Sequence, residues 1–184
     1  MKGALLINGI YEGVFLEILK AQEQRSGCES FLQPYSRKVI RSLQKHRPSP
    51  EDPVRLYAST TANLSQICYV AEIVNWEDKR TLSPERQHAV YQHLSRYQLK
   101  EVDLFRGKQE IGLKALNLIT IRNLRKLGTL HSTSLLTKVS DHMPLKARTR
   151  AGGWSEVYDL GDVIELPSAK REELEADLAS QVRD

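Results

Sequence analysis

The stretch from 67 to 76 limits most strongly what this chain can fold into. It is rich in apolar and β-branched residues, including Cys68, Val70, Ile73 and Val74, and such a run is typical of a buried strand. Further strands are predicted at 3–9, 29–35, 54–60, 114–122, 155–160 and 163–166. Helices are predicted at 12–25, at 36–46, from Ser83 to about Tyr97, at 132–139 and at 168–182.

These elements do not alternate regularly between strand and helix, which argues against a doubly wound parallel sheet. The order favours an α+β fold, specifically a small curved mixed β-barrel with peripheral helices. The chain has 184 residues, of which 40% are hydrophobic, and this is enough for one domain with a substantial core. We assign that domain to 1–167 and an acidic C-terminal helix or tail to 168–184.

Composition narrows the class of protein further. Two cysteines, Cys28 and Cys68, do not make a disulfide framework, and the five histidines lack the spacing of metal ligands, so neither a metal nor another cofactor is predicted. The apolar stretch at 4–7 is too short for a signal peptide, and no stretch is long enough to span a membrane. A cytoplasmic protein with no membrane partner is expected.

Charge is distributed unevenly along the chain. Before Trp154 there are 24 Lys and Arg against 14 Asp and Glu, and from Trp154 onwards there are three against nine. The segment 111–153 holds eight Lys and Arg and one acid, and 31–50 holds five with no acid. A basic body of this kind favours a polyanionic partner such as nucleic acid.

The segment 146–155 combines such charge with an aromatic residue. In a strand, Lys146, Arg148 and Arg150 would share one face, and the pair before Trp154 is Gly-Gly, which allows close backbone approach. Phosphate contacts beside a stacking aromatic ring are what a nucleic-acid site needs, so these four residues are predicted to bind nucleic acid. The alternative is a basic hairpin whose Trp154 fills the core.

Two strand ends supply further candidates. Ser59 and Thr60 end the strand at 54–60, where their hydroxyl groups can bond a phosphate or a base edge, or else the local backbone of a turn. Trp76 and Asp78 end the strongest strand, where a base can stack on the indole while the carboxylate accepts from an amino group. The alternative for Trp76 is packing beneath the helix that starts at Ser83.

Parts of the sequence resemble a known superfamily. The opening Met-Lys-Gly-Ala-Leu-Leu-Ile with the helix that follows it, the block Pro-Val-Arg-Leu-Tyr-Ala-Ser-Thr at 53–60, and the strand at 67–76 are together similar to the PUA-like superfamily. That superfamily includes the ASCH and EVE domains and the SRA base-flipping domain. The resemblance implies a small curved β-barrel that binds RNA, or modified bases in DNA or RNA, at its mouth.

Some ASCH members are amidohydrolases that act on acetylated cytidine with a Lys, a Thr and a Glu, and Lys20 and Glu72 fall where the Lys and Glu are expected. The Thr has no counterpart at 21–24. Glu72 shares its strand face with Val70 and Val74, which is typical of either a pocket carboxylate or a structural ion pair. The leading hypothesis is a nucleic-acid-binding domain. The alternatives are a hydrolase of a modified nucleoside and a non-catalytic protein-interaction module.

Overall fold

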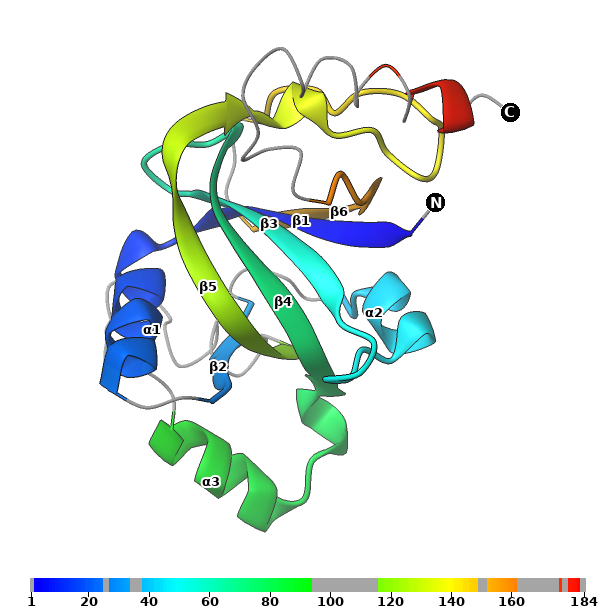
Figure 1. Ribbon diagram of the computed structural model, residues 1–184. Helices are drawn as coiled ribbons and strands as arrows, with labels where there is room; N and C mark the ends of the chain where they lie inside the picture. Colours follow the sequence, from blue (N-terminus) through cyan, green and yellow to red (C-terminus); the bar gives the residue numbers. More distant parts are fainter. Residues whose placement is uncertain are drawn as a thin grey trace.

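The computed structural model describes residues 2–24, 27–33, 38–93, 116–148 and 152–161, together with 176 and 179–182. Figure 1 shows strands that curve around one another, with α1 and α2 on opposite sides and α3 beyond the end of β4. In chain order the elements are β1 (Gly3–Ile10), α1 (Glu12–Gln24), β2 (Glu29–Leu32), α2 (Arg41–His46), β3 (Val54–Thr60), β4 (Gln66–Asp78), the 3₁₀ turn η1 (Lys79–Thr81), α3 (Pro84–His93), β5 (Asn117–Ser132), the 3₁₀ turn η2 (Thr133–Leu135) and β6 (Gly153–Tyr158).

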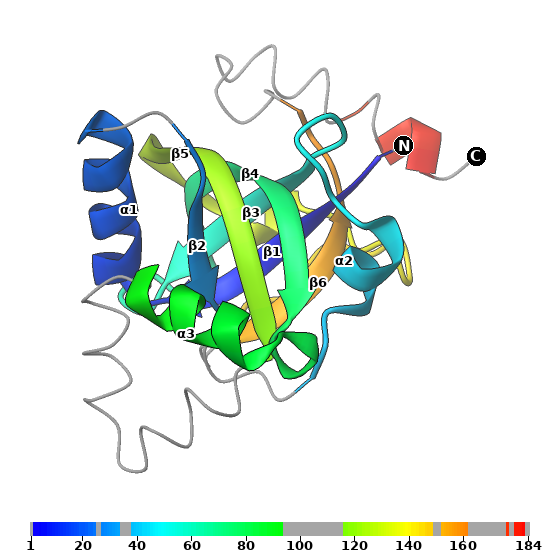
Figure 2. The same ribbon diagram turned by 90° about the horizontal axis from the view of Figure 1, so that it is seen from below.

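The six strands form one mixed sheet in the order β2-β5-β4-β3-β1-β6. β1 and β3 are parallel, and every other pair is antiparallel. The predicted α+β class is therefore confirmed. β2 and β6 are the two edges of this open sheet, so closure into a barrel is not observed. Figure 2 shows the same curved sheet from below. Its two edges are linked by one hydrogen bond, in which the Gln33 side chain after β2 donates from Nε2 to the Gly152 carbonyl before β6 at 3.4 Å.

β1 is buried on both faces, which explains why its sequence is a continuous apolar run. Leu5 and Ile7 point into the main core together with Phe15 of α1 and Ile73 of β4. The neighbouring positions on β1 belong to a second core on the opposite face, made by Ala4, Leu6, Tyr57, Ile67, Val70, Leu127, Leu136, Leu145, Val157 and Leu160. One sheet thus separates two apolar layers.

β5 continues past the end of β2, and a side chain takes the place of a neighbouring strand there. β2 pairs with β5 from Leu118 to Ile121. Three residues further on, the Gln22 amide of α1 accepts from the Leu124 backbone N–H at 2.9 Å and donates to the Leu124 carbonyl at 3.1 Å. Helix α1 is thereby fixed along the edge that β2 leaves uncovered.

Most predicted elements are confirmed, and the differences have local causes. The helix predicted at 36–46 begins only at Arg41, because Ile40 is extended and hydrogen-bonded to Asn117. The strand predicted at 29–35 ends at Leu32. The helix predicted at 132–139 was wrong beyond the short turn η2, since Thr137 bridges to Pro144 and Lys138 to Val157. The predicted strand at 163–166, the end of the helix near Tyr97 and most of the tail 168–184 lie outside the described residues.

The strand predicted at 114–122 is much longer in the structure, since β5 reaches Ser132. Its pairing with β4 has three register shifts, and Asn123 has a φ of 53°. These irregularities break the simple alternation that strand prediction depends on. Leu124 consequently packs in the main core, whereas Leu127 packs in the second core.

A polar cluster around the buried side chain of Tyr57 holds the end of β6 against β3. The Asp159 carboxylate is 2.9 Å from Nε of Arg55 and accepts from the Tyr57 hydroxyl at 3.1 Å. The same hydroxyl accepts from the Leu160 backbone N–H at 3.1 Å. Burial, together with the nearby Asp159 charge, raises the pKa of Tyr57, so its hydroxyl stays protonated and acts as a donor.

Tyr57→Phe should therefore destabilise the fold by about 1–3 kcal/mol, because it removes a hydrogen bond to a carboxylate and leaves the Leu160 N–H without its acceptor. Urea denaturation measures the free energy of unfolding. Tyr158→Phe is the matched control: its hydroxyl bonds His142 at the surface, so the loss should stay below about 0.5 kcal/mol. Equal losses in the two variants would contradict a structural role for the buried cluster.

Candidate functional site

A pocket of about 590 Å³ lies between the end of β4 and helix α2. This volume is within the range of about 300–1,000 Å³ found for small-molecule sites. It is lined by Gln44, Arg47, Pro48, Asn75, Trp76, Glu77, Asp78, Thr81 and Leu82. Two residues predicted from the sequence, Trp76 and Asp78, are therefore together in one pocket.

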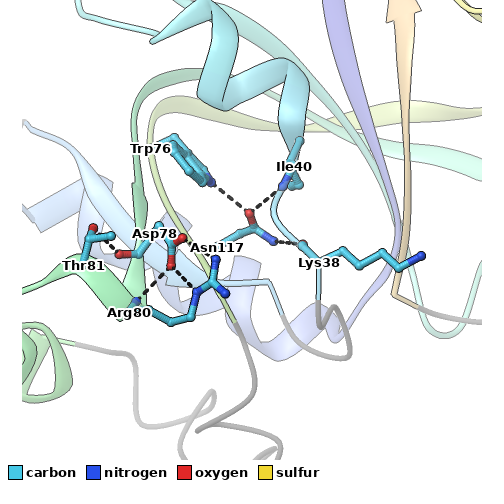
Figure 3. A network of polar contacts seen from close by, with 7 residues as sticks. All are labelled: Lys38, Ile40, Trp76, Asp78, Arg80, Thr81 and Asn117. Carbon is cyan, nitrogen blue, oxygen red and sulfur yellow. Dashed lines mark hydrogen bonds and ion pairs between the residues drawn. The ribbon is translucent and has the colours of Figure 1, made fainter.

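Trp76 forms the aromatic part of the β4 wall. It is half-buried and packs against the main core, and its Nε1 donates to Oδ1 of the buried Asn117 at 2.9 Å (Figure 3). The indole is thus fixed at its nitrogen while part of the side chain remains accessible. This combination suits a ring that stacks on a ligand.

The carboxylates of the β4 wall are paired with arginines. Asp78 accepts from the Arg80 guanidinium through both oxygens, at 3.1 Å and 2.8 Å, and from the Arg80 backbone N–H at 3.0 Å. The Arg80 hydrogen bonds lower the pKa of Asp78, so the carboxylate is ionised at neutral pH. Glu77 pairs with Arg86 at 3.1 Å. These pairs leave the β4 wall with little net charge.

Helix α2, with its C-cap, forms the opposite wall, where Arg47 is the one basic side chain among the lining residues. Its buried side chain Leu43 faces the core, and the helix ends at Arg47, which has a left-handed conformation with φ 54°. Arg41, Lys45 and Arg47 are exposed, and no ion pair among the described residues engages them. Sequence reasoning did not assign Arg47 or Gln44 to a site. The acid-free stretch 31–50, which the sequence analysis used only to favour a polyanionic partner, is the signal that could have found Arg47.

Ser59 and Thr60 lie away from this pocket, in the interior. Both residues are buried, at 0% and 1% exposure. The Ser59 hydroxyl donates to Oδ1 of Asn8 at 2.6 Å and accepts from the Gly9 backbone N–H at 2.8 Å. Ser59 therefore bonds β1, through the Asn8 side chain and the Gly9 backbone, rather than the local backbone of a turn.

Two residues of the predicted basic arm, Arg148 and Trp154, contact the body of the protein. The Arg148 guanidinium donates to the Ser155 hydroxyl at 2.6 Å and lies so close over Gly153 that a Cβ there would collide with it. Trp154 pairs with Ile7 in the sheet and packs against the main core. Lys146 is exposed, and Arg150 lies outside the described residues.

Three of the eight basic side chains in the segment 111–153 form ion pairs with other described residues, two of them with residues distant in sequence. Arg122 pairs with Glu72 at 2.8 Å, and Lys126 pairs with Glu12 at 2.9 Å. Lys138 pairs with the neighbouring Asp141 at 2.7 Å. The basic character expected for this segment is therefore weaker in the folded chain than in the sequence.

The two candidate catalytic residues are not brought together. Glu72 accepts hydrogen bonds from Arg122 and Asn123, both at 2.8 Å, and the bond from Arg122 is the main cause that lowers its pKa. Lys20 is exposed on α1. The structural ion pair, one of the two alternatives for Glu72, is the one observed. Within the described residues, no group of three His, Cys, Asp or Glu side chains is placed to hold a metal ion, and no helix has the length and apolar content to cross a membrane.

Trp154→Ala should lower the free energy of unfolding by about 2–4 kcal/mol, because the half-buried indole packs against the main core. Thermal or urea denaturation tests this. Met143→Ala is the control, since a side chain that is 58% exposed should cost less than about 0.5 kcal/mol. A Trp154→Ala protein as stable as the parent would contradict this core role and would favour the prediction that the indole stacks on a ligand.

Glu72→Gln should flatten the dependence of stability on pH. A carboxyl group whose folded pKa is lowered stabilises the fold above its unfolded pKa of about 4.3, and this contribution is lost as the pH falls through the folded value. Between about pH 5 and pH 3 the wild type should therefore lose up to about 1 kcal/mol more than the variant, as expected for a partly exposed pair. Glu23→Gln, on the exposed face of α1, is the control, and its curve should run parallel to that of the wild type.

Comparisons with known proteins add no relative to this description: no protein-family model matches the sequence, and no curated protein or solved structure matches it either. The pocket between β4 and α2 is accordingly the feature from which a function for this chain can be inferred.

Proposed function

We propose that this chain is a nucleic-acid-binding domain that takes one unpaired nucleotide, of RNA or of DNA with a modified base, into the pocket between β4 and α2. The observation that carries the proposal is the presence of a fixed, partly accessible indole and an exposed arginine, Trp76 and Arg47, in one pocket. Stacking on an aromatic ring with a cation on the phosphate is the common way in which proteins hold single strands. A base inside a duplex cannot reach such a ring.

The charges of the two walls orient the nucleotide. The α2 wall carries Arg47 with Arg41 and Lys45 nearby on the same helix, so the phosphates lie towards α2. The β4 wall offers the carboxylates of Glu77 and Asp78, already paired with arginines, and the amide of Asn75. The edge of the base lies on this side, where carboxylates accept hydrogen bonds from exocyclic amino groups.

The architecture supports the same proposal. We assign the chain to the PUA-like architecture, with the open sheet as a curved, incompletely closed barrel. The support is the approach of the two edges through Gln33 and Gly152. The hydrolase alternative receives no such support, because Glu72 is engaged by Arg122 and Asn123 rather than by Lys20.

Binding of single-stranded oligonucleotides tests the proposal, with fluorescence anisotropy measured at several salt concentrations. Arg47→Ala should weaken binding and reduce the slope of log K against log salt by about 0.7, the value for one lost phosphate contact on a single strand. Trp76→Ala should cost about 1–3 kcal/mol of binding free energy with little change in the slope.

Lys20→Ala is the matched control for this experiment. It removes the same charge from the exposed face of α1, which lies at the left of the curved strands in Figure 1 while α2 lies at the right, and it should leave both affinity and slope unchanged. A parent protein that binds neither RNA nor single-stranded DNA would refute the proposed function. An equal effect of Lys20→Ala and Arg47→Ala would refute the pocket as its site.

A further inference from the structure

The side chain of Asn117 connects the two walls of this pocket. Asn117 is the first residue of β5 and is 0% exposed. Its Oδ1 accepts from Trp76 Nε1 and from the Ile40 backbone N–H, both at 2.9 Å. Its Nδ2 donates to the Lys38 carbonyl at 2.9 Å and to Oε1 of Gln33 at 3.1 Å. Figure 3 shows this amide between Trp76 and the start of α2.

The partners determine how the amide is oriented. The indole Nε1 and the Ile40 N–H can only donate, so the oxygen of Asn117 must face them. The Lys38 carbonyl can only accept, so the nitrogen must face it. Both donor hydrogens and both acceptor sites of the side chain are used, and no other residue type offers this set in this volume.

On the β4 side, this bond restrains the ring of Trp76. The indole has one donor, and it is directed at Asn117. Because the bond is part-buried and its Asn117 end is fully buried, an indole without this acceptor would have an unsatisfied N–H or would turn towards water. The angle at which the ring faces the pocket therefore depends on the Asn117 oxygen.

On the other side, the same oxygen anchors the start of α2. Ile40 precedes the helix without a side-chain cap, and its carbonyl accepts from the N–H groups of Leu43 and Gln44, both at 3.1 Å. Arg47 then donates its N–H to the Leu43 carbonyl at 2.9 Å. A helix of six residues is too short to be stable by itself, so the position of Arg47 follows from how this start is held.

We propose that Asn117 is the positioning residue of the nucleotide pocket: one buried amide fixes the Trp76 ring and the α2 wall relative to each other, so that stacking and phosphate contacts can form together. Asn117 itself does not contact the ligand. This inference rests on the proposed function, because the ligand is the nucleotide proposed there. The dependence of the Trp76 orientation on Asn117 can be measured without any ligand.

The experiment uses the full chain with Trp154→Phe, so that Trp76 is the one remaining tryptophan of the two in the sequence. In this parent we compare Asn117→Asp, which keeps an oxygen towards Trp76 but loses both donors, with Asn117→Leu, which loses all four hydrogen bonds. Asn123→Asp is the matched control. It makes the same change further along β5, where the amide donates to Glu72 and not towards the pocket.

Three quantities are measured for each variant: the unfolding midpoint, the emission maximum and iodide quenching of Trp76 in the folded protein, and Kd for a single-stranded oligonucleotide. At a temperature where each variant is folded, both Asn117 variants should weaken binding roughly tenfold, the equivalent of about one hydrogen bond of restraint. Asn117→Leu should also shift Trp76 emission to the red and increase its quenching. Asn123→Asp should lower the midpoint without changing emission or Kd.

Each other outcome decides a different point. Asn117 variants that are folded, with emission and Kd equal to those of the parent, would overturn the proposal and leave Asn117 a purely structural residue. Weaker binding without any change in Trp76 emission for Asn117→Leu would also overturn it, since the ring would then not depend on the amide. If Asn117→Leu does not fold, Asn117→Asp decides through Kd, and a Kd equal to that of the parent would overturn the proposal. A parent that binds no oligonucleotide refutes the proposed function, while the emission data still test the orientation of Trp76.

Discussion

Burial of both faces of β1 is the constraint on which the rest of the structure depends. A strand in this position needs an apolar layer on each side and a hydrogen-bonded neighbour along each edge. β3 and β6 provide the neighbours. Helix α1 contributes to one layer, while the segment after η2 and the end of β6 contribute to the other. The polar cluster of Tyr57, Arg55 and Asp159 then holds the second layer against the sheet.

Elements set by local patterns could be predicted from the sequence. The strand β3 was predicted with its observed limits, because apolar alternation and a polar turn mark both ends. The start of α3 was also correct, and the Ser83 hydroxyl accepts from the Arg86 N–H at 3.1 Å as an N-cap does. β5 was underestimated, because its register shifts are set by pairing with β4 and leave no periodic signal in its own sequence. Closure of the sheet likewise depends on contacts between distant segments.

The candidate site was predictable to the same limited extent. Trp76 and Asp78 are neighbours in sequence and share the pocket, whereas Arg47 and Gln44 come from a helix that precedes them by a strand. The role of Asn117 could not be predicted from the sequence, because a single asparagine in a strand belongs to no motif and its four hydrogen-bond partners become known only from the structure. The basic segments of the sequence overstated the positive charge available for a ligand, because ion pairs with distant residues cannot be seen in the sequence. Arg122 and Lys126 look unpaired in sequence, but their partners lie on β4 and α1.

The contact between Gln22 and Leu124 has a consequence for how copies of this chain meet one another. Edge strands expose unpaired N–H and C=O groups, and these are the groups through which sheets of different molecules join into aggregates. β2 covers the β5 edge for only four residues. Beyond it, the primary amide of Gln22 presents one donor and one acceptor to Leu124, as a backbone residue of a neighbouring strand would. A glutamine side chain thus occupies a position that would otherwise be open to a strand from a second molecule.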